Sequence, residues 1–144
     1  MVARIFLIEA RPPERQWLAR TLAQAAYMVC GEASNRDEAL ALLDPAVADL
    51  IILDLAPGGE EGLDLITDLV GRGPALLVYS QVEDGETIVR AFAAGATGYV
   101  SKREETEILL TGVAQLLGKR RYISPRVTHT LADRILAAEI ADQG

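Results

Sequence analysis

The chain has 144 residues, of which 50% are hydrophobic and only 5% aromatic, a composition that suits one globular domain with an aliphatic core. Its net charge of -7 argues against direct binding of nucleic acid, because phosphate contacts need clustered Lys and Arg. The single cysteine, Cys30, excludes an internal disulfide and a cysteine metal cluster. No apolar run is long enough for a membrane span, and residues 1–8 lack a signal-peptide pattern, so we expect a soluble cytoplasmic protein.

Short apolar runs alternate with longer amphipathic segments along the chain. The apolar runs predict five strands, at residues 2–8, 27–32, 50–53, 75–79 and 97–100. The amphipathic segments predict five helices, at residues 13–26, 34–44, 62–70, 84–94 and 104–117. Ser34 is expected to cap the second helix, and Asp44-Pro45 to end it. A linker at residues 119–123 then leads to a last amphipathic helix that opens at Ser124-Pro125.

Strands that alternate with helices predict an α/β fold whose parallel sheet is covered by helices on both faces. Right-handed crossovers leave few arrangements of such a chain. We therefore predict a doubly wound five-stranded parallel sheet in the order 2-1-3-4-5, followed by a C-terminal linker helix.

Polar residues stand at the carboxyl ends of four predicted strands, at Glu9, Asp54, Ser80 and Lys102. Each alone is commonly a turn former or helix cap. If the strands are parallel, all four residues lie at one edge of the sheet, where open α/β sheets place their chemistry. A carboxylate there can act as a nucleophile toward a phosphoryl group, while an ammonium and a hydroxyl hold the phosphoryl oxygens.

Four segments carry a resemblance to a known family. They are Leu53-Asp54-Leu55 with Gly62, residues 77–80 (LVYS), residues 94–102 (AGATGYVSK) and residues 118–125 (GKRRYISP). Through them, residues 2–123 resemble the receiver domain of bacterial two-component response regulators, of the NarL/FixJ type with a LuxR-type output domain. The resemblance implies a flavodoxin-like fold, with residues 1–118 as the receiver domain and residues 119–144 as linker and C-terminal helix.

The same resemblance assigns roles at the sheet edge. Asp54 is expected to be the phosphorylation site, receiving its phosphoryl group from a sensor histidine kinase. Lys102 would pair with the acyl phosphate, Ser80 would be the switch hydroxyl, and the rotamer of Tyr99 would follow the movement of Ser80. No enzymatic activity is expected beyond self-catalysed phosphorylation and dephosphorylation of Asp54.

The magnesium site that the resemblance implies lacks one ligand. Asp54 and the backbone carbonyl of Ala56 match the direct ligands that remain, and Glu9 takes the first of two acidic positions. Ala10 takes the second, whose carboxylate would bind Mg²⁺ directly. We therefore predict weak Mg²⁺ binding and slow or absent phosphorylation. The alternative is that the longer side chain of Glu9 compensates.

A cation could instead come from Arg11 or Arg103. Three functions stay open at this stage: a phosphorylation switch, a phosphorylation-independent pseudo-receiver that binds other proteins, and a metal-dependent phosphohydrolase. The expected output surface is residues 84–117, and a homodimer could form there or through the first and fifth helices. We expect no membrane partner.

The family's DNA-binding output domain is absent from this chain, so DNA could be reached only through a domain that the chain lacks. Either the sequence is truncated, which we favour, or the protein is a stand-alone receiver. An apolar stripe on the last helix, at Val127, Leu131 and Ile135, could pack on the receiver, form a dimer contact or lie along a linker. Trp17 is interpreted as a half-exposed residue at the edge of the core or as a docking contact.

Overall fold

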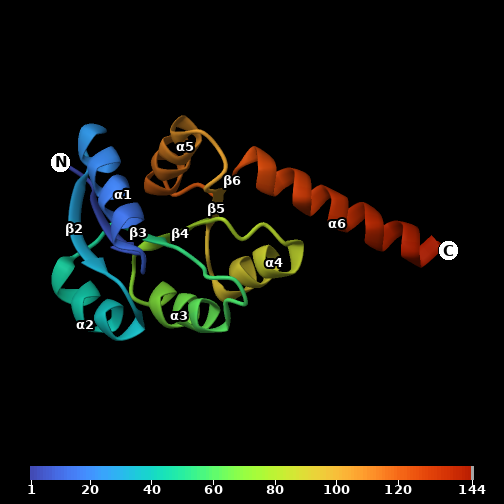
Figure 1. Cartoon of the computed structure of the whole chain (residues 1–144), viewed down its shortest axis with the longest axis horizontal. Helices are drawn as coiled ribbons and strands as arrows, with labels where there is room; N and C mark the ends of the chain where they lie inside the picture. The colour runs from blue at the N-terminus through green and yellow to red at the C-terminus, as the bar shows by residue number, and fades with distance from the viewer. Residues whose placement is uncertain (144) are drawn as a thin grey trace.

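Six parallel strands form the central sheet, in the order β2-β1-β3-β4-β5-β6 (Figure 1). The computed structural model describes residues 1–143, apart from the side chain of Pro45. The strands are β1 (Arg4–Ile8), β2 (Met28–Ala33), β3 (Leu50–Leu53), β4 (Ala75–Ser80), β5 (Gly98–Ser101) and β6 (Tyr122–Ile123).

Helices cover both faces of this sheet, as the alternating pattern predicts. In Figure 1, α1 and α5 lie on one side, whereas α2, α3 and α4 lie on the other. The helices are α1 (Pro12–Gln24), α2 (Arg36–Ala46), α3 (Glu60–Val70), α4 (Gly85–Ala94), α5 (Thr106–Leu117) and α6 (Pro125–Gln143).

The prediction of five strands is wrong by one strand. The first five occur in the predicted order, but Tyr122 and Ile123, which we assigned to a linker, pair with Gly98 and Tyr99 as β6. A two-residue strand is too short to show an alternating pattern in the sequence. It forms because the edge of β5 offers unpaired backbone groups, and Tyr122 N donates to the carbonyl of Thr97 at 3.1 Å.

The boundaries of α2 also differ from the prediction. Asn35, not Ser34, is the N-cap, since its side chain accepts a hydrogen bond from Glu38 N at 2.9 Å. Ser34 instead donates its backbone N–H and its hydroxyl to the carboxylate of Glu38. The helix continues through the predicted stop to Ala46 and ends at Val47 in a left-handed conformation.

Burial on both faces of the sheet explains why β3 is a continuous apolar run. Ile51 and Leu53 pack into the core under α2, α3 and α4, while Leu50 and Ile52 pack into the core under α1 and α5. All four side chains are at most 2% exposed. This rigid central strand places the residue that follows it, Asp54, at the carboxyl edge of the sheet.

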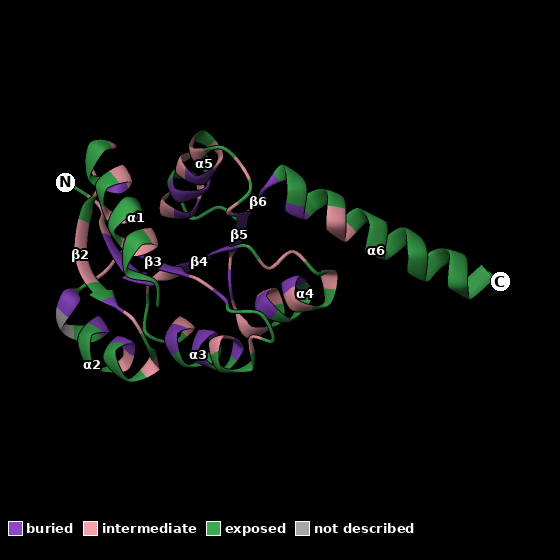
Figure 2. Ribbon diagram, in the orientation of Figure 1, coloured by how far each residue is buried: buried purple, intermediate pink, exposed green. Residues whose placement is uncertain are grey.

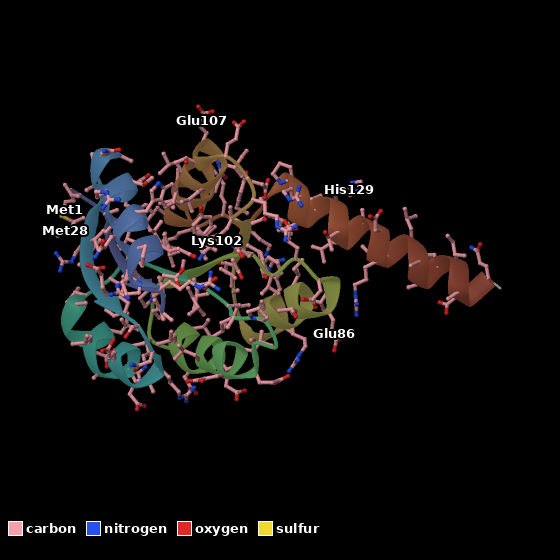
Figure 3. All side chains as sticks on the ribbon, viewed as in Figure 1. Met1, Met28, Glu86, Lys102, Glu107 and His129 are labelled. Atoms are coloured by element: carbon pink, nitrogen blue, oxygen red, sulfur yellow. The ribbon has the colours of Figure 1, made fainter. Side chains whose placement is uncertain are left out.

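The last helix, α6, packs on the domain only through its first turns and then extends away (Figures 1 and 2). Val127 is fully buried in the core under α4, and Leu131 packs against that core, whereas Ile135 is 64% exposed. Residues 132–143 are all exposed. The side chain of His129, in the first turns of α6, is likewise exposed and points away from the domain (Figure 3). Across residues 1–143, no helix combines the length and apolarity of a membrane span.

Replacing Val127 by alanine should reduce the free energy of unfolding by about 2 kcal/mol, because it leaves a cavity where α6 enters the core. Ile140→Ala removes a larger side chain on the same helix, but one that is 69% exposed, and should cost less than about 0.5 kcal/mol. Urea denaturation followed by circular dichroism measures both. Equal effects would show that the start of α6 contributes no core packing.

Candidate functional site

The register of the parallel strands brings the predicted site residues to one edge of the sheet. Asp54 N donates to the carbonyl of Ile8 at 3.0 Å, which places Asp54 beside Glu9. Lys102 N donates to the carbonyl of Ser80 at 2.9 Å, which aligns the ends of β4 and β5.

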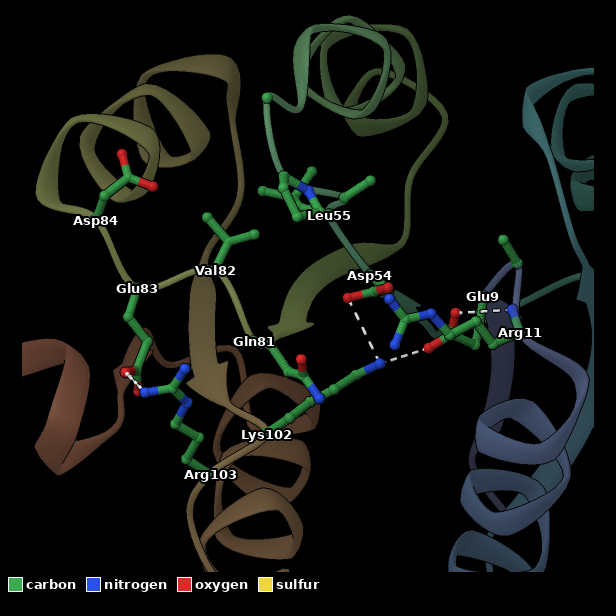
Figure 4. A pocket seen from close by; sticks show the side chains of 14 residues that line it. Glu9, Arg11, Asp54, Leu55, Gln81, Val82, Glu83, Asp84, Lys102 and Arg103 are labelled. Atoms are coloured by element: carbon green, nitrogen blue, oxygen red, sulfur yellow. Dashed lines mark hydrogen bonds and ion pairs between the residues drawn. The ribbon is translucent and has the colours of Figure 1, made fainter.

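These strand ends enclose a cavity of about 420 Å³ (Figure 4). Its lining contains Glu9, Ala10, Asp54 and Lys102, as well as Ala56 from the turn after β3. Ser80 is fully buried at the end of β4, next to this cavity. The sequence therefore predicted correctly which strand ends would meet, and the structure adds how the charges between them are arranged.

The ammonium group of Lys102 lies among three carboxylates. Its Nζ is 2.5 Å from Glu9 Oε1 and 3.5 Å from Asp54 Oδ1, and it also donates to Glu14 Oε2. Burial disfavours the charge of Lys102, yet the hydrogen bonds with Glu14 and Glu9 raise its pKa above the ordinary value. Lys102 is therefore a charged, nearly buried cation whose strongest contacts are with the two glutamates.

Sequence reasoning missed Glu14. The hydrogen bond from Lys102 is the largest influence on it and lowers its pKa to about 2. A second contact comes from Arg11, whose guanidinium lies 2.9 Å from Glu14 Oε1. A signal was present in the sequence, because Glu14 follows Pro13 in the first turn of a helix, and that turn lies at the carboxyl edge of a parallel sheet.

The predicted magnesium ligands do not fit a magnesium ion well. Both carboxylate oxygens of Glu9 are engaged, one by Lys102 and one by the backbone N–H of Arg11 at 3.0 Å. The carbonyl of Ala56 accepts a hydrogen bond from Gly59 N at 3.0 Å. The side chain of Ala10 has no oxygen that could bind a metal ion. Within residues 1–143, no three or more His, Cys, Asp or Glu side chains cluster as a metal site would require. Mg²⁺ demands near-octahedral oxygen ligation, which this set of donors does not supply.

Asp54 lines the cavity, and its side chain is 21% exposed. Burial raises its pKa to about 6, the nearby charge of Lys102 opposes this shift, and the charge of Glu9 adds to it. At neutral pH most of the carboxylate is ionised and can act as a nucleophile.

Ser80 and Tyr99 are connected through the backbone of Val82. The hydroxyl of Ser80 donates to the carbonyl of Leu55 at 2.8 Å and accepts from Val82 N at 3.0 Å. The hydroxyl of Tyr99 donates to the carbonyl of Val82 at 2.5 Å, and its side chain is fully buried. Both predicted switch residues therefore hold the same loop, between β4 and α4.

The next residue of that loop, Glu83, was not predicted and connects the loop with α6. Its carboxylate accepts two hydrogen bonds from the guanidinium of Arg126, at 2.7 and 3.0 Å, and one from the hydroxyl of Ser101 at 2.5 Å. These contacts, with that of Arg126 first, lower the pKa of Glu83 to about 2. Arg103 lies 3.5 Å from the same carboxylate. No spacing rule links positions 83 and 126, so the sequence could not reveal this pair.

The sequence pattern of the response regulator receiver domain matches residues 5–114. The chain belongs to this family. The family prediction from the four motifs is thereby confirmed.

Among curated relatives of this receiver, the nitrate/nitrite response regulator protein NarL of Escherichia coli (strain K12) is 32% identical over 138 residues. That alignment covers 94% of this chain and 64% of NarL. The DNA-binding transcriptional activator DevR/DosR of Mycobacterium tuberculosis is 29% identical over 140 residues, which cover 95% of this chain and 64% of that protein. The chain thus spans less than two thirds of the length of these relatives.

Solved structures of receivers share the architecture. A LuxR-family two-component response regulator from Aurantimonas sp. SI85-9A1 superposes with a TM-score of 0.87 at 26% identity, covering 94% of this chain and 99% of that one. The isolated receiver (REC) domain of RcsB from Salmonella enterica serovar Typhimurium, in the presence of phosphomimetic BeF₃⁻, gives a TM-score of 0.82. It covers 91% of this chain and 99% of the RcsB chain, and at 18% identity it supports the fold alone.

The pKa of Asp54 can be tested directly in buffer free of divalent cations. We expect its carboxyl carbon to titrate with a midpoint near 6 in NMR spectra, because burial disfavours the charge. The folded state binds this proton more tightly than the unfolded chain. The resulting stabilisation is therefore fully present below the ordinary pKa of 3.8 and is lost as the pH rises through about 6. Asp54→Asn should abolish the titration, and a midpoint near 4 would contradict the prediction.

Proposed function

We propose that this receiver accepts a phosphoryl group on Asp54 from a sensor histidine kinase and passes the change to its output surface. The observation that carries the proposal is the placement of Asp54, ionised and facing the cavity, with Lys102 Nζ at 3.5 Å. In the step, an Oδ of Asp54 attacks phosphorus while the bond from phosphorus to the kinase imidazole nitrogen breaks. The electron pair of that bond stays on the nitrogen, and the product is an aspartyl phosphate.

The proposed response begins at Ser80. A phosphoryl oxygen on Asp54 competes for its hydroxyl, which now donates to the carbonyl of Leu55 and accepts from Val82 N. Movement of Ser80 would leave Val82 N without its acceptor and shift the loop to which Tyr99 is bound. This loop leads into α4, so the surface of α4, β5 and α5 would carry the output.

The relatives suggest the wider setting. NarL and DevR/DosR are named as a response regulator and a DNA-binding transcriptional activator, and both are longer than this chain. One solved structure is titled as two RcsB dimers bound to two parallel DNAs. We propose that this receiver controls transcription in the cytoplasm through an output domain outside the chain, and that it dimerises through α4, β5 and α5 or through α1 and α5.

The hydrogen bonds of Glu9 and the absence of a carboxylate at Ala10 favour a second function, that of a pseudo-receiver. Because Ala10 provides no carboxylate and both oxygens of Glu9 are hydrogen-bonded, the cavity is poorly suited to Mg²⁺. If phosphorylation does not occur, the chain would act as a pseudo-receiver, a protein-binding module that keeps the fold without the chemistry.

Incubation with acetyl phosphate, with and without Mg²⁺, distinguishes the two functions. We expect intact-mass spectrometry to detect the added mass of one phosphoryl group, because Asp54 lines the open cavity and is mostly ionised at neutral pH. The added mass should be absent in Asp54→Asn and retained in Asp64→Asn, which alters an exposed aspartate on α3. Failure of the wild type to gain this mass under either condition would favour the pseudo-receiver.

A further inference from the structure

The cations around Asp54 are the starting point of a further inference. Lys102 and Arg11 line the same cavity as Asp54, and Figure 4 shows both groups at its rim. Arg11 is 60% exposed, so its side chain is free of dense packing and can move. Arg103 also lines the cavity, but its partner there is Glu83 on the side of α6.

Glu14 binds both Arg11 and Lys102. Its Oε1 accepts from Arg11 at 2.9 Å, and its Oε2 accepts from Lys102. The pKa of Arg11 is raised first by this hydrogen bond with Glu14 and further by the charges of Asp54 and Glu9. A single carboxylate therefore competes with any anion at Asp54 for the two positive side chains.

The family resemblance already assigns Lys102 to the phosphoryl group; we propose that Arg11 joins it there in place of Mg²⁺, and that Glu14 is a positioning residue that holds both cations until that group arrives. The proposal rests on the proposed phosphorylation of Asp54. A guanidinium can donate two parallel hydrogen bonds to phosphoryl oxygens, and an ammonium supplies a compact charge.

The charges explain why such a replacement is needed. Glu9, Glu14 and Asp54 carry three negative charges against the two positive charges of Lys102 and Arg11. Phosphorylation adds further negative charge, which a bound metal would normally offset in such a site. Ala10 stands where the family has a metal-binding acid, and Arg11 follows it directly. The lost metal ligand and the cation that we propose as a substitute for Mg²⁺ are therefore neighbours in the sequence.

Beryllium fluoride, an analogue of the phosphoryl group, provides the test on the full chain. Binding can be followed by the fluorescence of Trp17, the single tryptophan, which lines a neighbouring cavity together with Glu14 and Lys102. We expect the wild type to bind equally well with millimolar Mg²⁺ and in buffer from which Mg²⁺ and all divalent cations other than beryllium have been removed. Arg11→Gln should weaken binding about tenfold, because it removes a charge-assisted contact to the anion.

Glu14→Gln should have the opposite effect and tighten binding about tenfold, since it releases Arg11 and Lys102 toward the anion. Two matched variants serve as controls, Arg20→Gln on the exposed side of α1 and Glu61→Gln in the first turn of α3. Neither should change the binding. A general loss of stability could not weaken beryllium fluoride binding in Arg11→Gln and strengthen it in Glu14→Gln. Thermal denaturation verifies that each variant is folded. Ala10→Asp should create a dependence on Mg²⁺ that the wild type lacks.

Three results would overturn the proposal. One is saturation of the wild type by sub-millimolar Mg²⁺ with a matching gain in affinity for beryllium fluoride. The others are an Arg11→Gln variant that binds as the wild type does, and a Glu14→Gln variant that binds more weakly. If acetyl phosphate still modifies Asp54 in those cases, the proposed function stands and only the role of the cations is wrong. If no variant is phosphorylated, Ala10→Asp with Mg²⁺ included, the proposed function itself fails.

Discussion

The site depends on one interaction, the placement of the Lys102 ammonium among the carboxylates of Glu9, Glu14 and Asp54. The side chain of Lys102 is only 11% exposed, so its charge would be costly without such partners. The partners come from the ends of β1 and β3 and from the first turn of α1. The ion pairs of Lys102 therefore connect the end of β5 with β1, β3 and α1, and they set the shape of the cavity in front of Asp54.

The same edge of the sheet is mechanically connected to α6. Ser80 and Tyr99 hold the loop after β4 through Val82, and the following residue, Glu83, is bound by Arg126 of α6. Hydrogen bonds from Ser80, Tyr99 and Arg126 thus all reach the same short loop after β4. The same loop is therefore held against the start of α6, where Val127 is buried.

Much of this arrangement could be predicted from the sequence, because parallel strands impose it. Once the apolar runs are read as strands, Glu9, Asp54 and Lys102 must meet at one edge, and they do. The features that could not be predicted are contacts between residues far apart in the sequence. The strand at Tyr122–Ile123 exists only because β5 has an open edge, and Glu83 has no sequence relationship to Arg126. The N-cap at Asn35 was missed because Ser34 and Asn35 are both good caps, and only the backbone geometry chooses between them.

Ala10 has a different meaning in the sequence and in the structure. In the sequence it is the loss of a metal ligand, which by itself argues for an inactive pocket. In the structure, the neighbouring carboxylate of Glu9 is held by Lys102 and by the backbone of Arg11, and Glu14 binds the side chains of both residues. In this structure the carboxylates are paired with Lys102 and Arg11, and our proposal assigns to these two side chains the neutralisation of an incoming phosphoryl group.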